Sequence, residues 1–318
     1  MRVGAARCCV ASMNLLEALR YLTALEQHRH FGRAAQACRI TQPALSNAIR
    51  ALEQELGVPV VRRARQYEGL TTEGEVVLAH AHRLLREAES LRQELHSRVD
   101  APRGALQIGA VPTALPVAGR FAAQLRARHE GIEPVLRSLS SPEIEMGLEN
   151  LSLDMALGYT GREQVKARSL QIWPQYEERY FLVQRDDGGG GTPNAPATTW
   201  RESAALPLVM LTPEMHNRSI VEEAMRAAGA EPQPALETNS VLALVAALGD
   251  GTLAAVLPGA LLDVATGLTP LRVHPLIEPT VLTPIGFMTA AAARTTPALR
   301  AALELAQDPI WLQQLRRR

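Results

Sequence analysis

The sequence predicts an α+β protein of several domains, in which a small helical unit and one long helix precede a larger α/β region. Three patterns support this prediction: helical spacing of apolar residues near the N-terminus, a heptad pattern over residues 72–99, and alternating strand and helix patterns beyond residue 105. With 318 residues, of which 47% are hydrophobic and 21% charged, the chain can bury two or three cores. The formal net charge is zero, so any attraction to nucleic acid must come from a local basic patch.

The N-terminus and the cysteines indicate a cytoplasmic protein. The apolar run in MRVGAARCCVAS, residues 1–12, is too short for a secretory signal or a membrane span. Because Met13 begins a helical pattern, we expect residues 1–12 to be a disordered extension or a mis-assigned start. Cys8, Cys9 and Cys38 have neither zinc-ligand spacing nor the number needed for a disulfide framework. We therefore expect no metal, no cofactor and no membrane association.

Residues 13–71 are predicted to form a small, mainly helical domain. Its first helix carries an apolar stripe, and a short second helix is rich in alanine, which lets another helix cross closely. A third helix follows Thr41, a natural N-cap, has Pro43 in its first turn, where no hydrogen bond is lost, and ends at Gly57. The apolar stripes consist of Leu15, Leu16, Leu19, Leu22 and Leu25 in the first helix and of Leu45, Ile49, Leu52 and Leu56 in the third.

The opposite face of the third helix is polar, with Gln42, Ser46, Asn47 and Arg50 on it. Two helices joined by a short turn, the second with hydrogen-bonding residues at its N-terminal end, form the helix-turn-helix arrangement that fits the major groove of DNA. We expect Gln42 and Ser46 to contact base edges and Arg50 to contact phosphate. The alternative is that these residues are only the solvated face of a small helical domain.

A basic wing is predicted directly after the third helix. Two short strand patterns around residues 60–61 and 69–70 are separated by an arginine-rich turn. Its arginines would neutralise phosphates and make the affinity for DNA dependent on salt. The predicted DNA contacts are Arg33, Thr41, Gln42, Pro43, Ser46, Asn47, Arg50, Arg62, Arg63 and Arg65.

A long helix is predicted over residues 72–99, because this segment contains no proline and no glycine except Gly74. Its apolar residues repeat as in a two-stranded coil, so we expect the helix to join two copies of the chain. A dimer would present two reading helices to an inverted-repeat operator in double-stranded DNA. Packing of the helix against its own wing is the alternative. The repeat consists of Val77, Ala81, Leu84, Ala88, Leu91 and Leu95.

Beyond the hinge SRVDAPRG, residues 97–104, strand and helix patterns alternate to the end of the chain, which predicts an α/β domain over 105–318 with largely parallel strands. Such domains are common in enzymes. However, the sequence contains no nucleophile elbow, no phosphate-binding loop, no dinucleotide fingerprint and no metal-ligand spacing. We therefore expect no catalytic residues. A DNA-binding repressor or architectural protein that needs no ligand is a further alternative, and the large second region argues against it.

Together these residues resemble the LysR-type transcriptional regulators. The resemblance rests on FGRAAQACRITQPALSNAIRALEQELGVPV and LTTEGE in the first hundred residues, then on GALQIGAVPTALP, LSLDMALGY and SVLALVAALGDGTLAAVLP in the expected order. It implies a winged helix-turn-helix, a dimerising linker helix and a two-lobed effector domain like the periplasmic binding proteins, assembled as a homotetramer. The recognition pattern matches at Thr41, Gln42, Pro43, Ser46 and Arg50.

Two residues depart from the family pattern. Asn47 stands where the family often has arginine or lysine, so it could bond adenine instead of phosphate or guanine. Val61 replaces the usual phenylalanine and leaves a smaller plug beneath the wing.

The effector site is expected between two lobes, lobe one spanning 105–171 and 281–318 and lobe two spanning 172–280. Ligands of open α/β sheets bind at the carboxyl ends of parallel strands, and two such strands are followed by helix starts at Thr113 and at Ser140-Ser141. Ser141 is the better N-cap, because Pro142 then takes the first helical position. From lobe two, a loop is expected to offer the donors His216, Asn217 and Arg218.

Helix starts with hydroxyl groups favour a small anion or carboxylate as effector. The segments ENLSLDMALGY and LTPEMHNR resemble the branch of the family that regulates formate dehydrogenase operons, which suggests formate. Nothing in the sequence excludes a larger aromatic acid. The hydroxyls of Thr113, Ser140 and Ser141 could also be helix caps only, and His216 a surface residue.

Overall fold

The computed structural model describes residues 14–63, 67–96, 102–186, 188, 195–291 and 295–316. The predicted extension, residues 1–12, lies outside this range. The chain divides into two compact units, the first formed mainly by residues up to Arg92 and the second by the remainder of the chain. Among the described residues, no helix is long and apolar enough to cross a bilayer.

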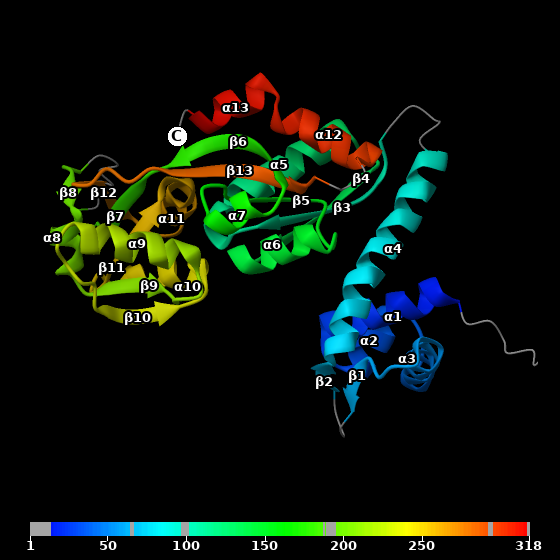
Figure 1. The fold of residues 1–318 in the computed structure, drawn as a ribbon. Coiled ribbons are helices and arrows are strands. Elements are labelled where there is room, and N and C mark those ends of the chain that lie inside the picture. Colours follow the sequence, from blue (N-terminus) through cyan, green and yellow to red (C-terminus); the bar gives the residue numbers. More distant parts are fainter. Residues whose placement is uncertain are drawn as a thin grey trace, which may run out of the picture. The chain divides into compact units, whose positions relative to one another are not determined.

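The first unit contains three short helices, a two-stranded sheet and one long helix (Figure 1). The helices are α1 (Leu15–His28), α2 (Phe31–Ala37) and α3 (Gln42–Leu56). The antiparallel strands β1 (Val61–Arg63) and β2 (Tyr67–Leu70) form the wing, and α4 (Thr72–His96) follows. The buried core contains Leu19, Leu22, Leu25, Leu45, Ile49, Leu52, Val60 and Val61.

Both apolar stripes are shorter than the sequence predicts. Leu15 and Leu16 are each 38% exposed and Leu56 is 42% exposed. These residues lie in the first turn of α1 and the last turn of α3, where the helices extend past the core that their middle turns bury.

The long helix α4 divides into a packed part and an exposed part. Val77 packs against the core of the first unit and Ala81 is fully buried in it, and Val61 and Leu70 of the wing belong to the same core, as the alternative of packing against the wing predicts. Leu84 and Leu91, further along the same repeat, are 45% and 55% exposed. The side chain of Leu95 and residues 97–100 lie outside the described residues. Because Leu84 and Leu91 are exposed, α4 still offers an apolar surface to a second copy of the chain, and the dimer remains a prediction.

The second unit begins with a five-stranded sheet, which we call lobe one. Its strand order is β4 (Ile132–Ser138), β3 (Gly104–Ala110), β5 (Met155–Tyr159), β13 (Thr283–Ala290) and β6 (Leu170–Glu178). Its helices are η1 (Pro112–Ala114), α5 (Leu115–Arg128), α6 (Ser141–Glu149), α7 (Glu163–Ala167), α12 (Pro297–Ala306) and α13 (Pro309–Arg316).

A six-stranded sheet forms lobe two. Its strand order is β10 (Pro234–Thr238), β9 (Leu208–Leu211), β11 (Ala254–Pro258), β7 (Tyr180–Arg185), β12 (Leu271–Ile277) and β8 (Thr198–Thr199). Its helices are α8 (Trp200–Ala204), α9 (His216–Ala227), α10 (Val241–Ala246), η2 (Ala247–Asp250), η3 (Gly259–Leu261) and α11 (Leu262–Leu268).

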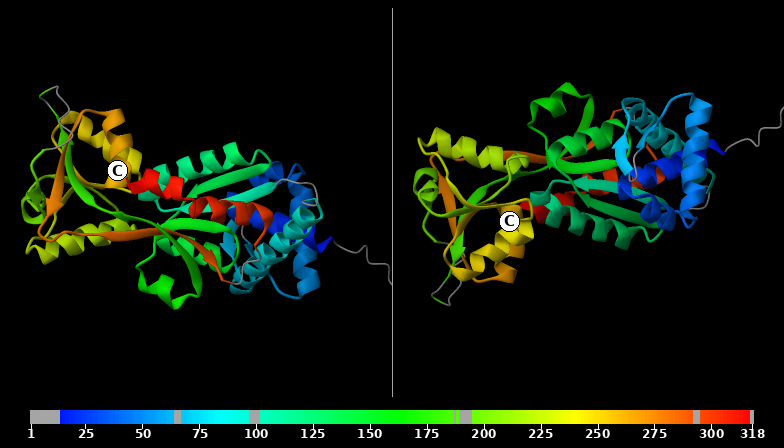
Figure 2. Two further views of the ribbon diagram at one scale, coloured as in Figure 1. Left: turned by 90° about the horizontal axis from the view of Figure 1, so that it is seen from above. Right: turned by 90° about the horizontal axis from the view of Figure 1, so that it is seen from below.

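The chain passes between the lobes twice, from β6 to β7 and from β12 to β13, and Figure 2 shows the extended green and orange strands that join them. The predicted lobe boundary between 171 and 172 is wrong. Residues 172–178 belong to β6, which pairs with β13 in lobe one along its whole length. The first crossing therefore lies at Arg179.

The sheets are mixed and not largely parallel as predicted. In lobe one, β3, β4 and β5 are parallel, whereas β13 runs antiparallel to both β5 and β6. In lobe two, β7 is antiparallel to β11 and β12. Every described antiparallel pair of these two sheets contains at least one of the strands next to a crossing, β6, β7, β12 and β13. The chain runs from β6 to β7 into lobe two and from β12 to β13 back into lobe one, so the two crossing segments run in opposite directions.

Candidate functional sites

The helix α3 starts and ends as its sequence predicts. The Thr41 side chain accepts a hydrogen bond from the amide of Ala44 at 3.4 Å, and Pro43 lies in the first turn. Gly57 ends the helix in the left-handed region with φ 71°. The helix packs on α1 and α2 through the middle of its apolar stripe, so its orientation is fixed by the core.

The polar face of α3 is directed away from this core. Gln42, Asn47 and Arg50 are exposed and Ser46 is half-buried. Arg50 donates a hydrogen bond to Oδ1 of Asn47 at 3.3 Å, so the residue that departs from the family pattern orients the neighbouring cation. Arg33 and Arg62 are also at least partly exposed, whereas Arg65 and the side chain of Arg63 lie outside the described residues.

The wing is anchored by an aromatic residue that the sequence analysis did not single out. Tyr67 packs edge-to-face against Phe31 with ring centroids 6.2 Å apart, and its hydroxyl donates to the Glu26 carboxylate. Val61 is 3% exposed in the same core. The smaller side chain at position 61 therefore does not leave the base of the wing unpacked.

A second site lies between the two lobes of the second unit. It is a small cavity, and all five predicted effector residues line it. Lobe one contributes the turn after β3, the start of α6 and the end of β5, and lobe two contributes the end of β9 and the start of α9. The lining residues are Val111, Pro112, Thr113, Ser140, Ser141, Tyr159, Leu211, Met215, His216 and Asn217.

Tyr159 connects the two sides of this cavity. Its hydroxyl lies 2.9 Å from Oγ1 of Thr113, and its ring packs edge-to-face on the imidazole of His216 at a centroid distance of 4.8 Å. Burial raises the pKa of Tyr159 to about 12. Burial, with the nearby charge of Arg162, lowers the pKa of His216 to about 4. Both side chains are therefore neutral near pH 7, so an anion in this cavity would be stabilised by dipoles.

Two polar atoms at the cavity make no hydrogen bond of good geometry among the described residues, although the Asn217 side chain lies near the hydroxyls of Tyr159 and Tyr180 and opposes the rise of their pKa. They are Oγ of Ser141 and Nδ2 of Asn217, in residues that are 5% and 6% exposed. A buried polar group without a partner costs about 1–3 kcal/mol. Ser141 comes from lobe one and Asn217 from lobe two, so one small polar ligand with acceptor atoms could satisfy both.

The local structure corrects three expectations about these residues. Helix α6 begins at Ser141, one residue earlier than predicted, so Ser140 precedes the helix and Pro142 is its second residue. The amide and the hydroxyl of Ser140 both donate to Oε2 of Glu143, each at 2.7 Å. His216 and Asn217 form the first turn of α9 and not a loop, and His216 is half-buried and not a surface residue.

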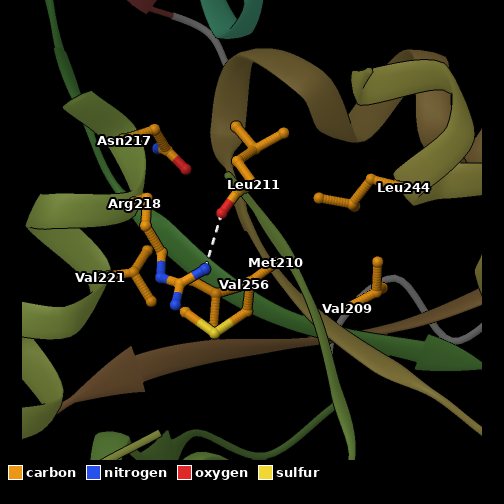
Figure 3. A pocket seen from close by; sticks show the side chains of 8 residues that line it. All are labelled: Val209, Met210, Leu211, Asn217, Arg218, Val221, Leu244 and Val256. Carbon is orange, nitrogen blue, oxygen red and sulfur yellow. Dashed lines mark hydrogen bonds between the residues drawn. The ribbon is translucent and has the colours of Figure 1, made fainter. Parts of the chain in front are cut away.

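Arg218 does not serve as a donor to this cavity. Its guanidinium group donates to the Leu211 carbonyl at 2.8 Å and to the carboxylates of Glu222 at 2.7 Å and Glu237 at 2.6 Å. Figure 3 shows it turned toward Leu211 in an adjoining small cavity, with the side chain of Asn217 apart from it. Arg218 therefore holds the start of α9 against β9 and positions Asn217.

Tyr159 and Met215 are the cavity residues that the sequence analysis missed. Tyr159 ends β5, a parallel strand whose carboxyl end lies beside those of β3 and β4. The rule that selected Thr113 and Ser140 would have selected Tyr159 as well. Met215 directly precedes α9, and its side chain has no polar group that would single it out.

Known protein families match both units of the chain. Residues 16–75 match the family described as bacterial regulatory helix-turn-helix protein, lysR family, and residues 100–309 match the LysR substrate binding domain. The second match covers more than half of the chain.

Several characterised bacterial regulators are similar in sequence. A hydrogen peroxide-inducible genes activator of Dickeya chrysanthemi is 34% identical over 146 residues, which are 46% of this chain and 48% of that protein. An SDS degradation transcriptional activation protein of a Pseudomonas species is 37% identical over 170 residues, or 51% of this chain and 55% of that protein. The chain thus spans about half the length of the curated relatives it matches.

Solved structures match over nearly the whole chain. A full-length OxyR variant from Pseudomonas aeruginosa superimposes with a TM-score of 0.68 at 23% identity, covering 94% of each chain. CbnR in complex with its target DNA gives a TM-score of 0.65 at 18% identity, covering 92% of this chain and 98% of that one. At these identities the likeness concerns the fold.

Proposed function

Since the chain belongs to the LysR family of bacterial helix-turn-helix regulators, we propose that it controls transcription by binding operator DNA as a dimer or tetramer in response to a small anionic metabolite. The families and relatives it matches are transcriptional regulators, in agreement with the prediction that it is not an enzyme. The proposed place of action is the cytoplasm, where the operator lies.

The exposed front of α3 supports the DNA-binding part of this proposal. Gln42, Ser46 and Asn47 carry hydrogen-bonding groups that can reach base edges, while Arg33, Arg50 and Arg62 can contact the backbone. The exposed Leu84 and Leu91 of α4 supply an apolar seam for a second copy of the chain. Two copies would read an inverted repeat, with half-sites about one helical turn apart or a multiple of it.

Substitution of Gln42 is expected to affect specificity, whereas substitution of Arg62 is expected to affect affinity for every sequence. Gln42→Ala should weaken binding to the operator by about 1–3 kcal/mol and relax the preference at one base pair. Arg62→Ala should weaken operator and random DNA alike and reduce the salt slope by about one unit. Fluorescence anisotropy at several salt concentrations measures both quantities.

Gln54→Ala is the matched control, because Gln54 is an exposed glutamine near the other end of the same helix. It should leave binding unchanged. If Gln42→Ala and Arg62→Ala reduced specific and non-specific binding equally, the division between base contact and phosphate contact would be wrong.

The buried Oγ of Ser141, which has no partner among the described residues, and the buried amide of Asn217 on the facing lobe, which makes no hydrogen bond of good geometry, are the observation that supports an effector in the cleft. They lie in the first turns of α6 and α9, where unpaired backbone amides attract negative charge. Among the described residues, no side chain that is charged near pH 7 lines the cavity, which favours a monoanion over a more highly charged ligand. Its small size favours a small carboxylate, and formate is the first candidate to test.

Several relatives are named hydrogen peroxide-inducible genes activators. A response of this chain to peroxide through a thiol of the effector region is not possible. Peroxide acts on cysteine thiolates by oxidising them to sulfenic acid. The three cysteines of the sequence lie at positions 8, 9 and 38, so residues 39–318, which include the whole effector region, offer no thiol. Similarity to the peroxide-inducible activators therefore supports the architecture and not the effector.

Replacement of Asn217 is expected to weaken the response to a small carboxylate. Asn217→Ala removes a buried donor whose bond to a charged group is worth about 1.5–3 kcal/mol, so affinity should fall about 10-fold to 100-fold. Thermal-shift titration with formate and acetate measures the loss, and formamide and acetamide are the neutral ligand controls.

Asn239→Ala, at an exposed asparagine of lobe two, should keep the full response. An equal response of both variants to formate would place the ligand elsewhere. If neither formate, acetate nor larger aromatic acids shifted the wild-type protein, the alternative of a ligand-independent DNA-binding protein would be favoured.

A further inference from the structure

A buried carboxylate lies where the chain first crosses between the lobes. Glu178 is the last residue of β6, pairs in register with Thr283 of β13, and is only 3% exposed. Its Oε1 accepts a hydrogen bond from the amide of Ala260 in η3 of lobe two at 3.1 Å. The carbonyl of the next residue, Arg179, accepts a bond from the amide of Gly259 at 2.9 Å. The crossing is therefore tied to the first turn of η3.

Residues of both lobes enclose this carboxylate. The groove that contains Glu178 is lined on the side of lobe one by residues of α5, β6, β13 and α13, and on the side of lobe two by Phe181, Gly259 and Ala260. If the lobes separated here, water would reach Glu178. Burial of its carboxyl group thus depends on the lobes being closed.

The same turn is adjacent to the effector cavity. Helix η3 packs against η1, which carries Thr113. A movement of η3 away from β6 would therefore disturb one wall of the cavity.

We propose that Glu178 makes closure of the two lobes sensitive to protons, so that the proton acts as a second effector that favours the closed arrangement of η3 on β6. This inference goes beyond the proposed function and does not depend on the identity of the metabolite.

The sign of the pH dependence follows from the environment of the Glu178 carboxyl group. Burial raises the pKa of Glu178 to about 7, against the opposing hydrogen bonds from the Ala260 amide, the Tyr176 hydroxyl and the backbone amides of Gly259 and Arg179. In open lobes, where Glu178 meets water, the pKa returns toward about 4.3. The closed state then binds the proton more tightly, so closure is favoured below about pH 7 and weakened above it.

The ionisable groups around Glu178 do not compete in this range. They are Tyr176 on the same strand, Tyr159 on β5, Tyr180 on β7 and Arg120 on α5, beside Tyr176. The pKa values of all three tyrosines are raised by burial, and arginine stays charged. From lobe two, η3 presents backbone amides to the carboxylate. Glu177 and Arg179, the sequence neighbours, are not buried.

Hydrogen exchange of the full-length protein tests the proposal without any ligand. The probe is the peptide that contains Gly259 and Ala260, compared at about pH 6 and about pH 8 after division by the intrinsic exchange rates. The two pKa values predict about tenfold less protection at the higher pH in the wild type. Glu178→Gln, which is permanently neutral, should remove this difference. Glu177→Gln, at the neighbouring glutamate on the same strand, should retain it.

The wild type alone can also contradict the proposal. A peptide from the last turns of α9, which packs on α8 and β9, is the internal reference, because it should show no such change. Equal pH responses of this peptide and of η3 would overturn the inference, even if Glu178→Gln failed to fold. A tenfold response that persisted in Glu178→Gln would do the same.

Discussion

Replacing Phe121 by alanine is expected to lower the free energy of unfolding of the second unit by about 3–5 kcal/mol. Phe121 is fully buried in α5. Its ring lies 4.4 Å from the ring of Phe287 in β13 and 5.4 Å from that of Trp311 in α13. The substitution would leave a cavity where three elements meet, and the elements come from both ends of the domain sequence.

Urea unfolding followed by tryptophan fluorescence measures this effect, since Trp311 lies beside the cavity. Phe121→Leu is the control, because it keeps most of the volume and should cost less than about 1.5 kcal/mol. Equal losses in the two variants would show that the aromatic cluster is not what stabilises lobe one.

Gly74→Ala is expected to have the second large effect, on the DNA-binding unit. A Cβ atom at position 74 would lie 2.0 Å from the carbonyl oxygen of Val60 and 3.1 Å from Cβ of Leu70. The first contact is to backbone, so the start of α4 and the wing would have to move apart. We expect a loss of about 3 kcal/mol, the upper end of the range for overpacking, together with loss of operator binding.

The displacement would also break a local hydrogen-bond network. Thr71 donates its hydroxyl to the Pro59 carbonyl at 2.7 Å and its amide to the Val60 carbonyl at 3.0 Å, while its Oγ1 accepts from the Gly74 amide at 2.9 Å. These bonds fix the wing on the first turn of α4. Thermal unfolding and anisotropy of the variant with operator DNA measure the two losses.

Gly119→Ala is the matched control for this substitution. Gly119 lies in α5, and a Cβ atom there would meet nothing within 4 Å. Alanine should therefore stabilise the helix by about 0.5–1 kcal/mol. If Gly74→Ala were as harmless as Gly119→Ala, the close approach of wing and helix would not exist in solution.

The first unit could be predicted from sequence almost element by element, because local signals coincide with the packing. Thr41, Pro43 and Gly57 mark the helix α3 by their own chemistry, and the 4, 3 spacing of Leu45, Ile49 and Leu52 marks its buried side. The spacing cannot show where the core ends. For that reason it assigns Leu56, which continues the pattern past the core, to a buried position although this residue is exposed.

The second unit could be predicted less completely, because two of its strands, β6 and β12, carry a proline at or near their middle. Pro174 interrupts β6 and Pro275 lies within β12, and proline in a strand argues against a central position. In β6 the ladder with β13 shifts register between Pro174 and Tyr176, so the proline is accommodated at an irregularity. Without β6 the lobe boundary could not be placed correctly.

The effector cavity could be predicted from a topological rule, whereas its details depend on contacts that no local pattern encodes. The carboxyl ends of β3 and β4 selected Thr113, Ser140 and Ser141, which the structure brings together with His216 and Asn217. Arg218 directly follows Asn217, so the sequence predicts both as donors to the cavity. The side chain of Arg218 instead pairs with Glu222 and Glu237. The distant partner Glu237 is brought near only by the fold.

The interleaved order of the strands has a consequence for synthesis of the protein. All described strands of lobe two lie in one stretch between Tyr180 and Ile277, whereas the lobe-one sheet places β13, which follows this stretch, between β5 and β6. On the ribosome, lobe two can therefore fold while lobe one still lacks its fourth strand and the helices that cover it. The cleft between them takes shape only after β13 has left the ribosome.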